Sequence, residues 1–257
     1  MKKRIENLTF DSTLSKFGKG LFETIKVHKG KAMLIDEHLD RIFNSLNELD
    51  FPFDITKKKI KEDIVSQCEA LNDKKDKALR LTVCDEGYNL SFRDITYGPK
   101  DYERGFNLCV SPVKRGFSPL YSHKTSNYLE NIYSLQKAKK RGFDEALFLN
   151  FEDMVLEGTI SNIFFVGEDK IFTPPLSLGI LPGIMRQKVI DSSKDLGIEV
   201  KYKEIKYSEI CNYNFSFITN SLMELMKVNM IQDFRFEDEN EVFAALNRKI
   251  KELLYEG

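Results

Sequence analysis

The chain has 257 residues, of which 42% are hydrophobic and 31% are charged. This composition is typical of a globular protein with a substantial core and excludes a disordered chain. Its 39 basic and 40 acidic side chains leave a net charge of −1, so no overall basic surplus favours nucleic acid or an anionic membrane as a partner.

The spacing of cysteines and histidines and the length of the apolar runs bear on metal binding, disulfides and membrane insertion. The four cysteines form no CxxC pair and the three histidines are scattered, so we expect no metal site and no disulfide framework. The N-terminal MKKRIENLTF has no apolar stretch behind its basic start, and no apolar run approaches the roughly 20 residues of a membrane-spanning helix. We therefore expect a cytoplasmic protein without membrane or nucleic-acid partners.

The first half of the chain is predicted to combine strands with two helices. Residues 21–27 alternate in polarity and meet the turn sequence His-Lys-Gly-Lys, a pattern typical of a hairpin. Asp36 is expected to cap a helix whose apolar residues recur at helical spacing. A second helix is predicted from about Thr56 to Leu71, and two strands within residues 77–97 are predicted to join around Glu86-Gly87.

A looser, proline-containing stretch over residues 98–123 separates the two halves, although residues 106–110 could form a short strand. Domain boundaries usually fall in such stretches. We therefore expect a small N-terminal α+β domain over residues 1–112, an interdomain loop over 113–122, and a larger C-terminal α+β domain over 123–257.

The second half is also predicted to mix helices and strands. A helix is expected from about Asn127 to Arg141, where Gly142 stops it, and another helix is expected to begin near Ile184. Because hairpins and helices occur in both halves, we expect an α+β fold rather than a regularly alternating parallel sheet. Strands are predicted in DEALFLN, NIFFVGEDKIFTPP, IEVKYKEI and FSFITNS, and a final amphipathic helix in NEVFAALNRKIKELLYEG.

Two charged residues stand out by their context. Lys124 lies between a proline-containing loop and a helix, and a partly desolvated lysine there could form a Schiff base with an aldehyde cofactor, although most lysines are simply solvated. Glu157 precedes Gly158 at an expected strand end with close backbone approach. It could form a salt bridge to an arginine, point to solvent, or keep a pyridine ring nitrogen protonated.

Two further segments have features of a phosphate site. In GILPGIMRQKVI a glycine-containing loop runs into a helix, so free backbone N–H groups and the helix dipole converge at Ile184 and Met185. In ITNS, Thr219 and Asn220 end a strand and could donate to an anion, although turns also explain both segments. Arg41 could supply positive charge, but an arginine on a helix is usually exposed.

Five segments in this order, spanning nearly the whole chain, resemble the class IV aminotransferase family, the fold-type IV pyridoxal-phosphate enzymes. The resemblance implies two α/β domains of the D-amino-acid aminotransferase-like type, with pyridoxal 5'-phosphate between them, and a homodimer. The matching segments are GKGLFETIKVHKGKAMLIDEHLDRIFNSL, KTSNYLENIYSLQKAKKRGFDEALFLN, LEGTISNIFFV, TPPLSLGILPGIMR and FITNSLMEL.

The resemblance also implies roles for individual residues. Met185 stands where the family often has threonine, which removes a hydroxyl from the phosphate site but leaves the backbone amide. The implied roles are the Schiff-base lysine for Lys124, the partner of the pyridine nitrogen for Glu157, phosphate binding for Arg41, Ile184, Met185, Thr219 and Asn220, and a place near the reacting atoms for Thr24.

Within the family, FETIKV and TNSLMEL look closer to aminodeoxychorismate lyases, and the Arg-x-His pair of D-amino-acid aminotransferases has no counterpart. We therefore expect a lyase that forms p-aminobenzoate and pyruvate. The alternatives are an aminotransferase for branched-chain or other small amino acids and a cofactor-free binding protein. Arg80 and Arg93 are conceivable carboxylate binders, but arginines on strand surfaces are common, so neither is included among the predicted site residues.

Overall fold

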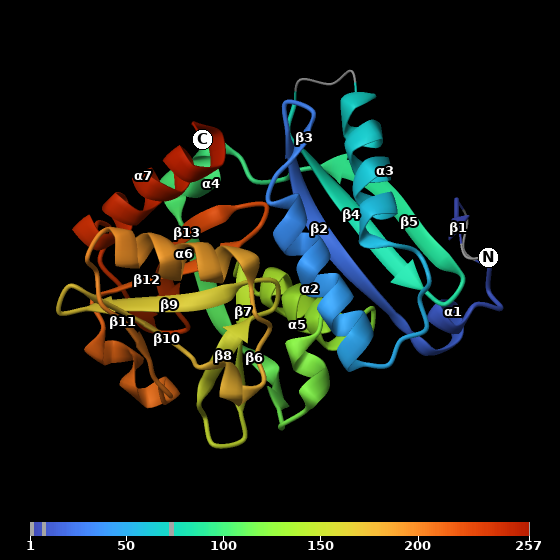
Figure 1. Ribbon diagram of the computed structural model, residues 1–257. Coiled ribbons are helices and arrows are strands. Elements are labelled where there is room, and N and C mark those ends of the chain that lie inside the picture. The colour runs from blue at the N-terminus through green and yellow to red at the C-terminus, as the bar shows by residue number, and fades with distance from the viewer. Residues whose placement is uncertain (1–2, 7–8, 72–74, 257) are drawn as a thin grey trace. The chain divides into compact units, whose positions relative to one another are not determined.

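The computed structural model describes residues 3–6, 9–71 and 75–256, and the chain divides into two compact units (Figure 1). The first unit consists of Met1–Thr96 and His123–Tyr128, and the second of Tyr97–Ser122 and Leu129–Gly257. Residues 113–122, expected as an interdomain loop, belong to the second unit, because strand β6 continues through Arg115. The short segment that carries Lys124 belongs to the first unit.

The first unit is a five-stranded sheet in the order β1-β5-β4-β2-β3. Helices α2 and α3 pack against the apolar side chains of one sheet face, which gives this unit its own core. All strand pairs are antiparallel except β1 with β5. The elements are β1 (Lys3–Arg4), α1 (Thr13–Phe17), β2 (Gly20–His28), β3 (Lys31–Ala32), α2 (Ile35–Glu48), α3 (Lys57–Glu69), β4 (Lys77–Cys84) and β5 (Gly87–Asp94).

Alternation along β2 separates core residues from candidate site residues. Leu21, Ile25 and Val27 lie in the core beneath the helices. Because successive side chains of a strand point to opposite faces, Phe22 and Thr24 lie on the other face. In the β2–β4 pair Thr24 is directly opposite Arg80, so both side chains lie on this second face.

The start of α2 differs from the sequence prediction. The helix begins at Ile35 after Leu34, which has φ of 51° and makes no side-chain cap, so the prediction that Asp36 caps the helix was wrong. Asp36 lies in the first turn, where a carboxylate interacts favourably with the helix dipole. Its carboxylate accepts hydrogen bonds from Lys61 Nζ at 2.7 and 2.8 Å.

The second unit is a nine-stranded mixed sheet in the order β11-β10-β9-β12-β13-β6-β7-β8, with β14 paired to β13. Strand β13, which the sequence analysis did not predict, joins β12 to β6. The elements are α4 (Pro99–Arg104), β6 (Phe106–Arg115), η1 (Pro119–Ser122), α5 (Leu129–Lys140), β7 (Glu145–Asn150), β8 (Val155–Gly158), β9 (Asn162–Gly167), β10 (Lys170–Thr173), η2 (Leu176–Leu178), α6 (Ile184–Asp195), β11 (Val200–Tyr202), η3 (Tyr207–Asn212), β12 (Phe215–Asn220), β13 (Glu224–Ile231), β14 (Phe234–Arg235) and α7 (Glu241–Tyr255).

Helices α5 and α6 pack against strands of this second sheet. Helix α5 packs against β6 and β7, while α6 packs against β12, β11 and α7. Near the middle of the sheet the rings of Phe164 on β9 and Phe217 on β12 stack with their centroids 4.9 Å apart. The core therefore fixes the ends of β8 and β12, which carry Glu157, Thr219 and Asn220.

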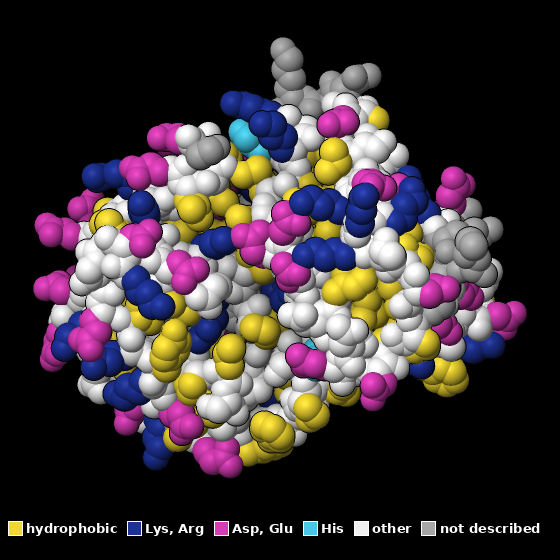
Figure 2. All heavy atoms as spheres, in the orientation of Figure 1, with side chains coloured by type: hydrophobic (Ala, Val, Ile, Leu, Met, Phe, Trp, Pro, Cys, Tyr) yellow, Lys and Arg dark blue, Asp and Glu magenta, His cyan; other side chains and the backbone are white. Residues whose placement is uncertain are grey.

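Within the described ranges no helix is long and apolar enough to cross a bilayer, and no cluster of His, Cys, Asp and Glu side chains there is suited to a metal ion. Figure 2 shows basic and acidic side chains interspersed over the visible face rather than segregated.

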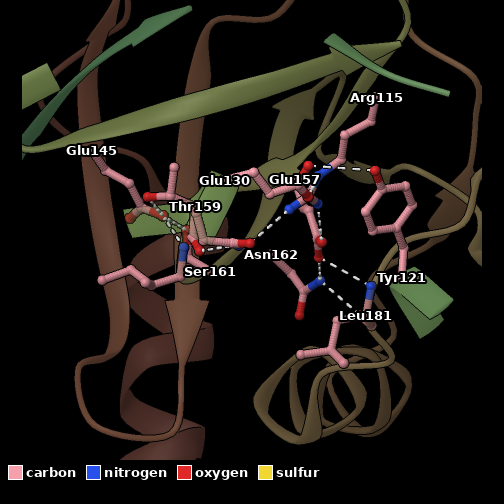
Figure 3. Close-up of polar contacts among 11 residues, drawn as sticks. Arg115, Tyr121, Glu130, Glu145, Glu157, Thr159, Ser161, Asn162 and Leu181 are labelled. Carbon is pink, nitrogen blue, oxygen red and sulfur yellow. Dashed lines mark hydrogen bonds and ion pairs between the residues drawn. The ribbon is translucent and has the colours of Figure 1, made fainter. Parts of the chain in front are cut away.

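The turn between β8 and β9 is held by a buried carboxylate. Glu145 Oε1 accepts hydrogen bonds from Ile160 N at 2.7 Å, Ser161 Oγ at 2.9 Å and Thr159 Oγ1 at 3.3 Å (Figure 3). Gly158 is needed beside it, because a Cβ there would overlap both Glu145 Oε1 and Ser161 Oγ. Complete burial raises the pKa of Glu145 to about 7, and the hydrogen bonds only partly oppose this effect.

The raised pKa predicts how Glu145→Gln alters the pH dependence of stability. The pKa rises on folding from 4.5 to about 7, so the folded state binds the extra proton in this range. The free energy of unfolding should therefore fall by about 3 kcal/mol as the pH rises from 4.5 to 7. We expect this decline to be absent in Glu145→Gln. The check is the free energy of unfolding measured by urea titration at pH 5 and at pH 8.

The exposed Glu152 offers a control, because Glu152→Gln should keep the wild-type pH dependence. An equal pH dependence in wild type and in Glu145→Gln would contradict the assignment.

Candidate active site

The candidate residues fall into two groups, one within each unit, and each group is described within its own unit. Lys124, Thr24 and Arg41 belong to the first unit, and the remaining candidates to the second. Those of the second unit are Glu157, Ile184, Met185, Thr219 and Asn220.

Lys124 is held beside β2 by the backbone. Its carbonyl accepts a hydrogen bond from Phe22 N at 2.9 Å, and Ser126 N donates to Gly20 O at 2.8 Å. The Nζ atom of Lys124 lies 4.5 Å from the centroid of the Phe22 ring and 5.5 Å from that of Tyr128. The two rings meet edge to face at 5.3 Å, so the partly buried amine lies against aromatic walls that limit its hydration.

Arg80 contacts the same aromatic ring as Lys124, that of Phe22. Its guanidinium carbon is 3.8 Å from the Phe22 centroid, and its Nε donates to Thr82 Oγ1 at 3.3 Å. Burial lowers the pKa of Arg80, and among the described residues no carboxylate pairs with it. A partly desolvated guanidinium without an acidic partner is suited to bind an anion. The sequence analysis left Arg80 out, since nothing in its local sequence shows this proximity.

Arg41 is held by a buried carboxylate on β2. Its Nε and Nη2 donate to Glu23 Oε1 and Oε2 at 2.8 and 2.6 Å, and His38 Nδ1 lies 2.7 Å from Glu23 Oε2. Burial alone would raise the pKa of Glu23, but the Arg41 charge and the His38 hydrogen bond outweigh it and lower this pKa to about 2. The orientation of Arg41 is therefore set by an ionised Glu23, and phosphate binding by Arg41 stays a prediction.

Glu157 is the central acceptor of the second group. It lies on β8 and is 7% exposed. Its Oε1 accepts from Arg115 Nη1 at 2.9 Å, and its Oε2 accepts from Leu181 N at 3.1 Å and Asn162 Nδ2 at 3.3 Å (Figure 3). The salt bridge to an arginine considered in the sequence analysis is thus present. Glu157 also has two neutral donors that orient its second oxygen.

Arg115 is the residue of this group that the sequence analysis missed. It lies at the end of β6, is 3% exposed, and donates from Nε to Glu130 Oε1 at 2.7 Å and from Nη2 to Asn131 Oδ1 at 3.1 Å. The guanidinium packs against the rings of Phe148 and Tyr121 at 3.6 and 4.6 Å. Because residues 113–122 were expected to be a loop, no strand pattern marked Arg115 as buried.

The loop before α6 connects Glu157 to the residues that are predicted to bind phosphate. Helix α6 begins at Ile184 after Gly183, which has no side chain to cap it, so within the described part of the chain no N-cap side chain accepts from the first-turn N–H groups of Ile184 and Met185. A Cβ at Gly183 would overlap Asn162 Oδ1. The Asn162 side chain donates to Leu181 O at 3.0 Å and so ties this loop to β9.

Thr219 and Asn220 end β12, against which α6 packs. Thr219 Oγ1 is buried without a hydrogen-bond partner, which suits a group that donates to an absent anion. The Asn220 side chain is used in its own turn, where Oδ1 accepts from Leu222 N and Met223 N, each at 2.9 Å. Uncapped amides together with an unpartnered hydroxyl fit a phosphate group.

Comparison with known proteins identifies the family of this chain. The family model described as amino-transferase class IV matches residues 20–231. A Rickettsia felis protein named "Probable branched-chain-amino-acid aminotransferase" is 30% identical over 224 residues, which cover 82% of this chain and 77% of that protein. The aminodeoxychorismate lyase of Bacillus subtilis is 27% identical over 263 residues, which cover 93% of this chain and 88% of the lyase.

A solved structure agrees with both matches. The branched-chain aminotransferase of Thermoproteus uzoniensis, crystallised with norvaline, superposes with a TM-score of 0.86 at 25% identity, covering 96% of this chain and 89% of that one. The fold class predicted from the sequence is confirmed by this likeness. Since the family model extends over most of the chain, the protein is an enzyme and belongs to the class IV aminotransferase family.

Proposed function

We propose that the protein is a pyridoxal-phosphate-dependent aminodeoxychorismate lyase, which converts 4-amino-4-deoxychorismate to p-aminobenzoate and pyruvate. The observation that carries the cofactor assignment is in the second unit, where Leu181 N of the loop before the uncapped start of α6 donates to Glu157. Asn162, which also donates to Glu157, lies opposite Thr219 in the β9–β12 pair, and the Thr219 hydroxyl has no partner. Pyridoxal phosphate is the cofactor of class IV aminotransferases.

When bound, this cofactor supplies an aldehyde that condenses with amines and a ring that accepts electrons released at the substrate carbon. Lys124 would hold the aldehyde and, once the substrate amine replaces it, act as the base that removes a proton from the carbon bearing that amine. Its aromatic walls, Phe22 and Tyr128, would keep water from the amine. Glu157 would keep the proton on the ring nitrogen.

The remaining candidates would hold the phosphate and the substrate. The amides of Ile184 and Met185 and the hydroxyl of Thr219 would donate to the phosphate, with positive charge from Arg41. Asn220, whose side chain shapes the turn after β12, would support that contact. Arg80, with Thr24 opposite it on the sheet, would donate hydrogen bonds to a substrate carboxylate, which both amino acids and aminodeoxychorismate carry.

The lyase is supported by the Bacillus subtilis enzyme, whose match covers 93% of this chain. An aminotransferase for branched-chain or other small amino acids is the second candidate, because the Rickettsia felis relative is more similar in sequence, at 30% identity. A cofactor-free binding protein is disfavoured, because a decayed site has no physical need to retain both Lys124 and Glu157.

Release of products separates the two enzyme candidates. In the lyase, a proton leaves the substrate carbon bearing the amine and the C–O bond to the enolpyruvyl group breaks at the neighbouring carbon, so the substrate ring becomes aromatic. The released enolpyruvate takes up a proton and becomes pyruvate. Stoichiometric pyruvate and p-aminobenzoate from 4-amino-4-deoxychorismate would support the lyase. Amino-group transfer from leucine or valine to 2-oxoglutarate, without activity on aminodeoxychorismate, would overturn it in favour of the aminotransferase.

The absorbance of the purified protein tests the role of Lys124. We expect a visible cofactor band, and we expect borohydride to fix the cofactor covalently on Lys124, because its amine is the group proposed to condense with the aldehyde. Lys124→Ala should lose both the covalent attachment and activity. Lys139→Ala, at an exposed lysine of α5, is the control. Persistence of the covalent attachment in Lys124→Ala would contradict the assignment.

The substrate role of Arg80 predicts a change in KM. Loss of a charge-assisted hydrogen bond costs about 2 kcal/mol, so Arg80→Met should raise KM for the amine substrate roughly 30-fold and change kcat much less. The matched control is Arg93→Met, an exposed arginine on the neighbouring strand β5. An equal rise in KM in both variants would show that overall charge, rather than a contact from Arg80, is responsible.

The protein is also proposed to be a cytoplasmic homodimer without membrane or nucleic-acid partners. Large apolar side chains exposed on the second unit support self-association, among them Phe117 at 81%, Leu129 at 79% and Phe151 at 69% exposure. Light scattering should then report twice the mass of the 29.9 kDa chain, whereas a monomer mass at micromolar concentration would contradict the dimer.

A further inference from the structure

One guanidinium in the second unit is shared between two carboxylates. Arg115 donates from Nη1 to Glu157 Oε1 at 2.9 Å and from Nε to Glu130 Oε1 at 2.7 Å. The cluster therefore holds one positive and two negative charges. The close-up in Figure 3 places Glu130 and Glu157 on either side of this arginine.

We propose that Glu130 is a positioning residue for the cofactor chemistry. Glu130 neutralises part of the positive charge of Arg115. The charge of Glu157 is then less fully compensated and stabilises a proton on the cofactor's ring nitrogen more strongly. This inference rests on the proposed function and adds to it a residue that makes no contact with the cofactor in the assigned roles.

The environment of Arg115 makes such sharing effective. The guanidinium is 3% exposed and packs against the rings of Phe148 and Tyr121 at 3.6 and 4.6 Å. A third contact, to Asn131 Oδ1 at 3.1 Å, prevents it from rotating freely. Arg115 therefore cannot turn toward solvent when one of its carboxylates is altered, so its charge must be balanced locally.

The consequence for Glu157 follows from charge. A carboxylate paired alone with a buried guanidinium has a lower proton affinity than one that shares the guanidinium with a second carboxylate. Without the negative charge of Glu130, Glu157 would stabilise the protonated ring nitrogen less well. The ring would then withdraw electrons less strongly during proton removal.

Further polar groups lie around the cluster, and one of them, Tyr121, contacts Glu130 directly. Glu145 and Arg186 are buried and electrostatically coupled to Glu157. Tyr121 donates from its hydroxyl to Glu130 Oε2 at 3.4 Å. Glu130 itself has a side-chain exposure of 28%, so replacing it alters the charge at the edge of the cluster and leaves the core intact.

The test is the pH titration of the visible band of the cofactor-loaded protein. A protonated ring nitrogen lowers the pKa of the Lys124 nitrogen that is linked to the cofactor. If the ring nitrogen holds its proton less strongly, the pKa of the Lys124 nitrogen should rise. We expect Glu130→Gln to move the titration midpoint upward by about half a pH unit to one unit. Glu130→Asp, which restores the negative charge, should lie closer to the wild type.

The control is Asp153→Asn, which removes a carboxylate paired at 2.6 Å with Lys114, the neighbour of Arg115 on β6. Its midpoint should equal that of the wild type, and thermal unfolding without cofactor should show that each variant folds. Coincident midpoints for Glu130→Gln and Asp153→Asn would overturn this inference. Absence of any visible band in the wild type with added cofactor would instead overturn the proposed function.

Discussion

The burial of the Glu157 carboxylate is the constraint on which the second unit depends most. An ionised group with so little exposure is tolerated only when a counter-charge and further donors replace the lost water. Arg115 supplies the charge, and Leu181 N and Asn162 supply the donors. These donors come from β6, from β9 and from the loop before α6, so satisfying one carboxylate fixes the relative positions of three segments.

A similar arrangement organises the first unit. Glu23, buried within β2, pairs with Arg41 and His38 of α2. Burial lowers the pKa of His38, so the imidazole serves as a neutral donor and Arg41 carries the balancing charge. Removing one partner of such a pair would leave an uncompensated charge. Each unit thus orients one arginine by a buried carboxylate, and each arginine lies in a candidate group.

Some features were predictable because they depend on local sequence. The start of α6 at Ile184 follows from a glycine that precedes an apolar helical pattern, and the strand carrying Glu157 follows from its apolar neighbours. The cap of α2 was not predictable, because Leu34 adopts a left-handed conformation that its residue type rarely favours. Strand β13 was missed because it begins in a tight turn at Glu224, where φ is 60°.

The sequence by itself determined the family and the fold class and predicted the roles of Lys124 and Glu157, because these inferences depend on short segments in a fixed order. Only the tertiary structure showed that Arg115 is buried between two carboxylates and that Arg80 shares the Phe22 ring with Lys124. Partners separated by 42 residues, as Arg115 and Glu157 are, leave no periodic signal. Their proximity arises only when strands far apart in the chain pair side by side.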